Sequence, residues 1–265
     1  MERVKVLVHG ALGKMGQEVL HAVSRDPKLE AVAGVDVKAG KKEILRPDGA
    51  SSIPLYPDLE SALQHCHPDV FVDFTNAEAA MPAVRTAVGH GIAVVVGTTG
   101  LSDAELREIE SLCRQKKVGA VVAPNFAIAA VLMMHLAKVA ARFFDYAEVI
   151  ELHHEQKLDA PSGTALATAR GMVQARGSNF VHVSAKKENI AGSRGGDLGG
   201  VAIHSVRMPG LLAHQEVILG APGQTLRIRL DQINREAFMP GVILAIKQAA
   251  GLKEAVLGLD KLLGL

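Results

Sequence analysis

The sequence contains no tryptophan, and aromatic residues make up only 3% of its 265 positions. Aliphatic residues, alanine and methionine must therefore fill the core. The formal net charge is +1, so no excess of either sign points to nucleic acid or an acidic membrane surface as an obligatory partner. The two cysteines, Cys66 and Cys113, lie in unrelated contexts, and we expect them to be reduced, as in a cytosolic protein.

Signatures of several other protein classes are missing as well. No apolar stretch approaches the length that crosses a bilayer, and no leader-like segment precedes the first apolar run. His, Cys, Asp and Glu nowhere follow metal-ligand spacing, so we expect no metal. A Walker loop and a G-x-S-x-G elbow are absent too, which argues against phosphoryl and acyl transfer. These absences leave the expectation of a cytoplasmic protein with no membrane partner.

The first half of the chain alternates strand-like and helix-like segments. Apolar runs predict strands over 4–8, 29–35, 70–74, 92–96 and 118–122. Helical segments are predicted in the intervals, over 14–25, 58–65, 77–89 and 102–116. Alternation at this spacing is typical of an α/β fold with a doubly wound parallel sheet of the Rossmann type.

The second half of the chain has a different pattern of predicted helices and strands. A long helix over about 127–144 is predicted before a strand over 146–152 and a helix over 163–176. Apolar and charged residues then alternate over 226–230, as in a sheet with one face in water, and we expect 201–206 and 216–219 to be its neighbours. The pattern predicts a second α+β domain with a mixed or antiparallel sheet. Residues 184–200, with five glycines, are predicted to be a long loop, and a last helix runs through Ala250.

The turn after the first predicted strand is rich in glycine. Gly10, Gly13 and Gly16 follow that strand and open a helix, the context in which a glycine loop seats the pyrophosphate of a dinucleotide. The predicted contacts in this loop are Gly10, Ala11, Leu12, Gly13, Lys14 and Met15. Asp36 can hold the adenosine ribose, which favours NADH, whereas Lys14 and Lys38 can pair with the 2′-phosphate of NADPH. The choice between the two cofactors stays open at this point.

Two further loops lie at the carboxyl ends of predicted strands, the edge at which open α/β sheets bind ligands. Small and hydroxyl-bearing residues there suit a nicotinamide and its ribose. The candidate contacts are Gly97, Thr98 and Thr99 in one loop, and Ala123, Pro124, Asn125 and Phe126 in the other. Each loop taken singly would pass for an ordinary turn, and only their shared edge makes them candidates.

The most informative segment, residues 151–165, reads E-L-H-H-E-Q-K-L-D-A-P-S-G-T-A. It leads from a strand into a helix whose first N–H groups and dipole favour a carboxylate or phosphate. Two histidines alone would be interpreted as solvated surface residues, but here a cation and an anion-binding helix start stand beside them. The candidates are His153 and His154 for proton transfer, Lys157 as the cation, and Gly163 with Thr164 as the anion cradle.

This segment resembles the signature of the 4-hydroxy-tetrahydrodipicolinate reductases, also called dihydrodipicolinate reductases. The resemblance covers nearly the whole chain in the family's order. It extends through Gly10–Gly16, Asp73–Thr75, Gly97–Gly100, Ala123–Phe126, Ser205–Gly210, His214–Glu216 and Phe238–Gly241. The departures are small: Lys14 stands where an arginine is frequent, and His9 precedes the first glycine.

The resemblance implies the reduction of 4-hydroxy-tetrahydrodipicolinate (dihydrodipicolinate), a cyclic dicarboxylate, to tetrahydrodipicolinate by NADH or NADPH in lysine and diaminopimelate synthesis. It implies that His153 is the acid/base and Lys157 the proton donor. His154, Gly163 and Thr164 would bind the substrate carboxylates. It further implies a homotetramer built through the second sheet. A dinucleotide-binding domain would then comprise 1–126 with 237–265, and a substrate-binding and oligomerisation domain 127–236.

Two other interpretations stay open. Another two-domain dehydrogenase, acting on an aldehyde or an amino-acid intermediate, would share the glycine loop but has no use for a carboxylate cradle beside the paired histidines. A regulatory protein that senses NAD(P)H without turnover would need no proton donor. Hydride addition to a conjugated imine does need one, because the negative charge that it leaves on the ring must be protonated.

Overall fold

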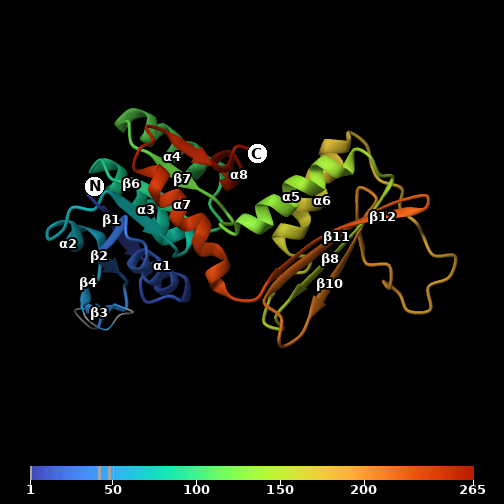
Figure 1. The fold of residues 1–265 in the computed structure, drawn as a ribbon, viewed down its shortest axis with the longest axis horizontal. Coiled ribbons are helices and arrows are strands. Elements are labelled where there is room, and N and C mark those ends of the chain that lie inside the picture. Colours follow the sequence, from blue (N-terminus) through green and yellow to red (C-terminus); the bar gives the residue numbers. More distant parts are fainter. Residues whose placement is uncertain (1, 41–42, 47–48, 50) are drawn as a thin grey trace. The chain divides into compact units, whose positions relative to one another are not determined.

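The computed structural model describes residues 2–40, 43–46, 49 and 51–265, and the chain divides into two compact units (Figure 1). Unit 1 comprises Met1–Ile128 together with Phe238–Leu265. Unit 2 comprises Ala129–Ala237. The chain therefore leaves unit 1 once and returns to it near its end.

Unit 1 is built on an eight-stranded sheet in the order β13-β7-β6-β5-β1-β2-β4-β3. Neighbouring strands are parallel, except that β3 and β4 are antiparallel. The strands are β1 (Val4–His9), β2 (Leu29–Val35), β3 (Glu43–Leu45), β4 (Ser52–Tyr56), β5 (Val70–Asp73), β6 (Ala93–Val96), β7 (Ala120–Val122) and β13 (Ala255–Leu257). The helices are α1 (Lys14–Arg25), α2 (Leu59–Leu63), α3 (Ala77–Gly89), α4 (Asp103–Lys116), α7 (Met239–Ala249) and α8 (Leu259–Leu263).

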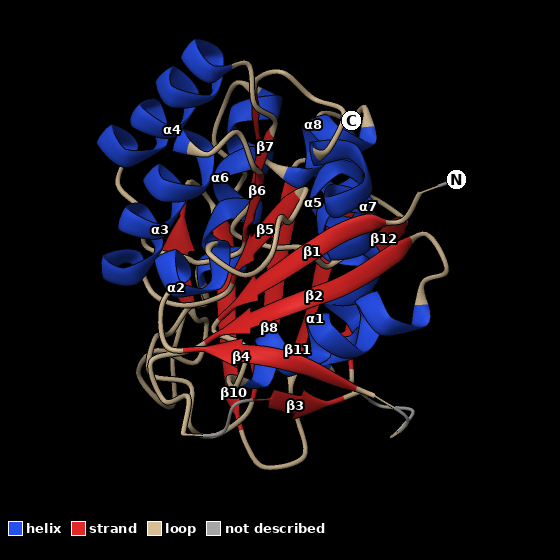
Figure 2. Ribbon diagram, turned by 90° about the vertical axis from the view of Figure 1, so that its left-hand side faces the viewer, coloured by secondary structure: helices blue, strands red, loops and turns tan. Residues whose placement is uncertain are grey.

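Helices cover both faces of this sheet. Figure 2 shows α2, α3 and α4 on one side and α1 and α7 on the other, and the helices of each group also contact one another. The residues of β5, β6 and β7 are accordingly all buried, as expected for parallel strands under two helical layers. Local signals fix the helix starts: the side chains of Ser102 and Glu105 form a capping box at α4, and Asn76 caps α3.

Unit 2 contains a five-stranded mixed sheet in the order β12-β11-β8-β10-β9. Its strands are β8 (Tyr146–His153), β9 (Gly196–Leu198), β10 (Val201–Arg207), β11 (Ala213–Ala221) and β12 (Gln224–Gln232). Only β8 and β10 are parallel neighbours. Helices α5 (Ile128–Ala141) and α6 (Gly163–Arg176) lie along one face (Figure 1), where residues such as Val149 and Met172 form the core of the unit. A short 3-10 helix, Arg235–Phe238, leads back to unit 1.

The predicted fold class is confirmed, but three details of the prediction are wrong. Strand β10 pairs with β8 and β9 and not with β12, because β8, α6 and β10 form a crossover that joins parallel strands. The predicted loop over 184–200 contains the short strand β9. The sequence also gave no sign of β3, β4, β13 and α8, which have three to five residues each and are too short for a readable period.

Candidate active site

The turn from β1 into α1 leaves no room for a side chain at two of its three glycines. Gly10 has a φ of 79°, and a Cβ added there would lie 2.7 Å from the carbonyl oxygen of Phe74. A Cβ on Gly16 would lie 2.0 Å from the carbonyl oxygen of Gly10. Gly13 precedes α1, whose first turn has neither a side-chain cap nor an acidic residue. The N–H groups at the start of α1 are therefore available to an anion such as a pyrophosphate.

A carboxylate ties this loop to the end of β2. Oδ2 of Asp36 accepts the N–H of Leu12 over 3.0 Å, and Oδ1 accepts the N–H of Lys38 over 2.9 Å. Each carboxylate oxygen has a second lone pair, so Asp36 can still accept hydrogen bonds from ribose hydroxyls. The side chains of Lys14 and Lys38 are exposed, where a 2′-phosphate could reach them.

The remaining predicted contacts of the loop differ in exposure. Ala11 is buried and donates its N–H to the carbonyl oxygen of Val35, and Met15 is half-buried in the first turn of α1. A cavity of about 1100 Å³ adjoins the loop, and the residues that line it are Leu12, Lys38, Gly40, Glu43, Ile44, Leu45 and Leu55. The sequence did not predict the apolar side of this cavity, because it comes from β3 and β4, which were not predicted either.

The two other predicted cofactor loops of unit 1 lie together. Thr98 and Thr99, after β6, and Pro124, after β7, line one cavity of about 150 Å³. A Cβ on Gly97 would lie 2.1 Å from the ring of Phe74, so a larger residue at this position would require that ring to move. In the second loop Ala123 and Phe126 are buried, and the side chain of Asn125 accepts the N–H of Ala127 over 2.8 Å.

A buried carboxylate connects the first of these loops, through Thr98, with the residue that precedes the glycine loop. Asp73, at the end of β5, has no solvent exposure. Its Oδ1 lies 2.7 Å from Nδ1 of His9 and accepts the hydroxyl of Thr75 over 2.8 Å, and its Oδ2 accepts the hydroxyl of Thr98 over 2.5 Å. We did not predict Asp73 as a site residue, although an acidic residue at the end of a buried central strand is a usable signal.

In unit 2, the predicted acid/base residue stands at the end of β8 beside a second buried carboxylate. Nδ1 of His153 lies 2.5 Å from Oε2 of Glu151, which has no solvent exposure. Arg207, on β10, donates to both carboxylate oxygens of Glu151 over 2.8 and 2.7 Å. The backbone N–H of Ser162, the N-cap of α6, donates to Oε1 of the same carboxylate over 3.2 Å. Two strands and the start of a helix therefore meet at Glu151.

The predicted cation lies in the loop between β8 and α6. Nζ of Lys157 forms an ion pair of 2.7 Å with Oδ1 of Asp159. Arg207 also donates to the carbonyl oxygen of Asp159 over 2.7 Å. Hydrogen bonds thus lead from Lys157 through Asp159, Arg207 and Glu151 to His153. The sequence did not predict Glu151 or Arg207 as site residues, although Glu151 is an acid on the same strand face as His153, two residues earlier.

The anion cradle forms the first turn of α6. Gly163 is exposed, and a Cβ there would meet nothing within 4 Å, so the steric need for glycine at the other loop is absent here. Thr164 is half-buried, and the side chain of Ser162 accepts the N–H of Ala165 over 3.2 Å. That hydrogen bond uses one of the first N–H groups of α6, and the N–H groups of Gly163 and Thr164 are left for a carboxylate. His154 is half-buried in the loop just after β8.

Burial and charge set the protonation states of this cluster. Burial favours the neutral form of Glu151, but hydrogen bonds from Arg207, Ser205 and His153 outweigh it and hold the pKa below 4.5, its ordinary value. Loss of hydration is the largest influence on His153 and keeps the pKa of its imidazole below 6.5, against the opposing effect of Glu151. At neutral pH the cluster therefore contains an ionised Glu151 beside an imidazole that is mostly neutral.

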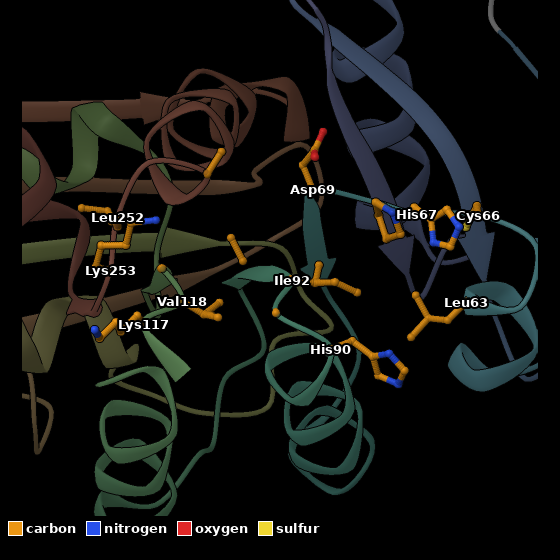
Figure 3. A pocket seen from close by; sticks show the side chains of 15 residues that line it. Leu63, Cys66, His67, Asp69, His90, Ile92, Lys117, Val118, Leu252 and Lys253 are labelled. Atoms are coloured by element: carbon orange, nitrogen blue, oxygen red, sulfur yellow. The ribbon is translucent and has the colours of Figure 1, made fainter. Parts of the chain in front are cut away.

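A further cavity of about 550 Å³ opens at the amino-terminal edge of the sheet in unit 1, opposite the predicted cofactor loops (Figure 3). Figure 3 shows Lys117 and Lys253 on one side of it and His67 and His90 on the other, so these basic groups do not converge. None of the predicted site residues lines it. Among the described residues no group of His, Cys, Asp and Glu could hold a metal ion, and no described helix is long and apolar enough to span a membrane.

Comparison with known proteins gives consistent matches along the chain. The family described as "Dihydrodipicolinate reductase, N-terminus" matches residues 4–126, and "Dihydrodipicolinate reductase, C-terminus" matches residues 129–263. The chain is 54% identical to the 4-hydroxy-tetrahydrodipicolinate reductase of Dehalococcoides mccartyi over the full length of both. It is 43% identical to the protein of the same name from Bacillus velezensis, over 99% of this chain and 98% of that one.

Solved structures give the same result for the fold. The dipicolinate-bound dihydrodipicolinate reductase from Paenisporosarcina sp. TG-14 is similar with a TM-score of 0.87 and 41% identity, over 98% of this chain and 99% of that one. An amine dehydrogenase from Mycobacterium smegmatis, 15% identical over 97% of this chain and 95% of that one, has a TM-score of 0.65 and shares the fold.

Proposed function

The chain belongs to the dihydrodipicolinate reductase family, and on that basis we propose how its own residues reduce 4-hydroxy-tetrahydrodipicolinate to tetrahydrodipicolinate. The protein is an oxidoreductase of lysine and diaminopimelate biosynthesis that uses a nicotinamide cofactor. The observation that carries the assignment of roles is the cluster in unit 2 that connects His153 with Lys157 next to the open start of α6. This cluster combines groups that donate protons with N–H groups that bind a carboxylate.

We assign the binding of the substrate carboxylates to His154 and to Gly163 and Thr164 in the first turn of α6. The dipicolinate in the Paenisporosarcina reductase is itself a cyclic dicarboxylate, which supports a dicarboxylate site in this chain. Lys157 would exchange its ion pair with Asp159 for one with the substrate. Its positive charge then stabilises the negative charge that develops on the ring, and Nζ supplies the proton. Nε2 of His153, which does not face Glu151, would serve as the acid/base.

When bound, the nicotinamide supplies the hydride. Two features of the chain fit this cofactor. The start of α1 has no side-chain cap, and two glycines of the loop stand where an added Cβ would clash with backbone. The assigned contacts are the two groups of loop residues named above, Gly10–Met15 with Asp36 and Lys38, and Gly97–Thr99 with Ala123–Phe126. Unit 1 would thus be the dinucleotide-binding domain, comprising 1–126 with 237–265. Unit 2 would be the substrate-binding and oligomerisation domain, comprising 127–236.

Both NADH and NADPH should serve, with NADH at least as effective. Asp36 offers acceptors to the ribose hydroxyls of NADH, while the exposed Lys14 and Lys38 can compensate the charge of a 2′-phosphate. Steady-state kinetics with each cofactor test this. A hundredfold preference for NADPH, equivalent to about 2.7 kcal/mol, would refute it. Asp36→Ala should weaken the binding of NADH more than the binding of NADPH.

The activity itself is tested by the loss of NADH absorbance in the presence of substrate that is generated enzymatically in the same cuvette. We expect turnover, and competitive inhibition by dipicolinate. An aldehyde or amino-acid dehydrogenase would oxidise NADH with other substrates only, and a sensor of NAD(P)H would bind it without turnover. We also propose a cytoplasmic homotetramer, assembled through the sheet of unit 2, with no nucleic-acid or membrane partner. Sedimentation equilibrium tests the tetramer.

A further inference from the structure

Glu151 is an ionisable side chain without solvent exposure, and the roles assigned above give it no task. Removing a carboxylate from water is costly unless donors surround it. Here several donors do so: two hydrogen bonds come from the guanidinium of Arg207, and one each from the N–H of Ser162, the side chain of Ser205 and Nδ1 of His153. A carboxylate held in this way also fixes the positions of the groups that donate to it.

The hydrogen bond between His153 and Glu151 has a consequence for the imidazole. An ionised carboxylate can only accept hydrogen bonds, so the proton of the neutral ring must sit on Nδ1. The lone pair is then on Nε2, the nitrogen assigned to proton transfer. Arg207 keeps Glu151 ionised, because a guanidinium stays charged at any working pH and its two parallel N–H groups match a carboxylate.

We infer that Glu151 and Arg207 are a positioning pair for the reduction: Glu151 holds His153 in the Nδ1–H tautomer, and Arg207 fixes both Glu151 and the loop that carries Lys157. The second part rests on the hydrogen bond of 2.7 Å from Arg207 to the carbonyl oxygen of Asp159, whose side chain pairs with Lys157. One guanidinium thereby sets the geometry of both proton-transferring groups. This inference rests on the proposed roles of His153 and Lys157.

The same strand provides a matched control. Three residues before Glu151, on the opposite face of β8, Glu148 accepts hydrogen bonds from Arg194 over 2.5 Å and from His204 over 2.9 Å. The residue types are identical, but the side chain of Glu148 is 35% exposed and that of Glu151 is not exposed at all. Glu148→Gln therefore removes a carboxylate from a similar His–Glu–Arg group that lies outside the proposed site.

Glu151→Gln is informative because an amide cannot replace this carboxylate. Each oxygen of Glu151 accepts at least two hydrogen bonds, whereas a glutamine offers one acceptor and one donor group. If its NH₂ takes the place of Oε2, Nδ1 of His153 must become an acceptor, and the ring proton moves to Nε2. If its NH₂ takes the place of Oε1, it faces the donors of Arg207 and Ser162. Either outcome disturbs the arrangement that we infer.

The tautomer can be measured directly by ¹⁵N NMR of protein labelled at histidine, with the His153 signals assigned from their absence in His153→Ala. We expect the Nδ1–H tautomer in the wild type and in Glu148→Gln, and the loss of its dominance in Glu151→Gln. Titration in the same experiment should give a lower pKa for His153 in Glu151→Gln, because a carboxylate that stabilises the imidazolium is gone. The other charged groups near the ring, Lys157 and Arg207, are retained.

The kinetic expectation separates the two members of the pair. Glu151→Gln should lower kcat about 10- to 100-fold, a part of what general acid–base catalysis supplies, and change KM for the substrate less than about threefold. Arg207→Lys keeps the charge but loses the two-pronged contact. Since Arg207 also holds the loop of Lys157, this variant should lower kcat and raise KM together. Glu148→Gln should keep both constants, with circular dichroism and sedimentation checking the fold and assembly of every variant.

The outcomes that would overturn the inference are distinct from those that would overturn the proposed function. A wild type that does not reduce the substrate refutes the function, and the NMR measurement still decides the tautomer. If the wild type is active but its His153 carries the proton on Nε2, the positioning role is wrong. It is also wrong if Glu151→Gln keeps more than half of the wild-type kcat, or if Glu148→Gln loses as much as Glu151→Gln. Should Glu151→Gln not fold, the wild-type tautomer and Arg207→Lys still decide the question.

Discussion

The candidate cofactor edge of unit 1 and the cluster of unit 2 present different kinds of chemical group to a ligand. In unit 1 the ligand-facing groups are mostly backbone N–H groups, exposed because glycines bring helix and loop into direct contact. In unit 2 they are side chains that carry charge or protons, held by one another through short hydrogen bonds. A pyrophosphate has fixed charges and needs only donors, whereas a reacting ring needs groups that can give up a proton. Added volume should therefore damage the first site, and lost charge the second.

The largest effect should come from removing the proton-transferring groups of unit 2. His153→Ala and Lys157→Ala should each lower turnover by about 10² or more, the usual scale for such groups. Lys157→Ala should also weaken substrate binding, because it loses a cation. The affinity for NADH, measured by fluorescence titration, should stay the same, because the contacts that we propose for NADH lie in unit 1. If each variant keeps more than about half of the wild-type turnover, the assignment of roles is wrong. His90→Ala, an exposed imidazole of unit 1, is the control.

A smaller effect, on binding and stability, should follow from adding one methyl group in unit 1. The Cβ of Gly16→Ala would lie 2.0 Å from the carbonyl oxygen of Gly10, and backbone must move to admit it. We expect the Kd for NADH to rise at least about tenfold, and the free energy of unfolding to fall by about 1–3 kcal/mol. At saturating NADH, kcat should change less than Kd. Gly89→Ala, where an added Cβ meets nothing within 4 Å, should leave NADH binding unchanged. Equal NADH affinity in Gly16→Ala and the wild type would contradict the comparison.

A still smaller effect should come from the helix start of unit 2, where backbone and side chain contribute together. Thr164→Val keeps the shape of the side chain but removes the hydroxyl. KM for the substrate should rise about three- to tenfold, the loss expected for one typical hydrogen bond, with kcat nearly unchanged. Thr225→Val, on the exposed β12, should alter neither constant. A fall in kcat without a change in KM would show that Thr164 acts in the chemistry and not in binding.

The smallest effect concerns the dependence of stability on pH. Because the pKa of Glu151 is lower in the folded protein than its ordinary value of 4.5, its ionised form stabilises the fold above that pH. This contribution diminishes as the pH falls below about 4.5 towards the folded pKa. Thermal melts of the wild type and Glu151→Gln should therefore differ most at pH 7, and the difference should shrink as the pH is lowered from 7 to below 4.5. A difference in Tm that stays constant over this range would show that the charge of Glu151 does not stabilise the fold.

Much of the architecture could be predicted because its signals are local. Buried apolar runs predicted five strands of the parallel sheet, β1, β2, β5, β6 and β7, to within two residues. The side chains of Ser102 and Ser162 cap helices that begin at the next residue. The glycine loop was equally readable, since a clash of 2.0 Å at Gly16 arises between residues six positions apart. Short elements were not predictable in this way. Strand β13 exists because it pairs with β7, whose sequence lies more than a hundred positions earlier.

The candidate site divides in the same manner. His153 and Lys157 could be predicted because they lie within one loop beside a recognisable helix start. Glu151 gave a weak signal, an acid two residues before His153 and on the same face of the strand. The spacing of the sequence gave no signal for Arg207, because this residue is 56 positions away from Glu151. It reaches Glu151 only because β10 is the parallel neighbour of β8. Asp73 likewise gains its partners from His9 and Thr98, 64 and 25 residues away.

The sequence by itself determined the two kinds of domain, the glycine loop and the segment that carries the proton-transferring groups, because periodicity, capping and steric exclusion act between near neighbours. Only the tertiary structure decided which strands pair, and hence which charges meet. An arginine finds a buried carboxylate through non-local strand pairing, and the free energy of that contact depends on burial, which no local pattern encodes. The tautomer of His153 also depends on the tertiary structure. It follows from the carboxylate of Glu151, which Arg207 from another strand keeps ionised.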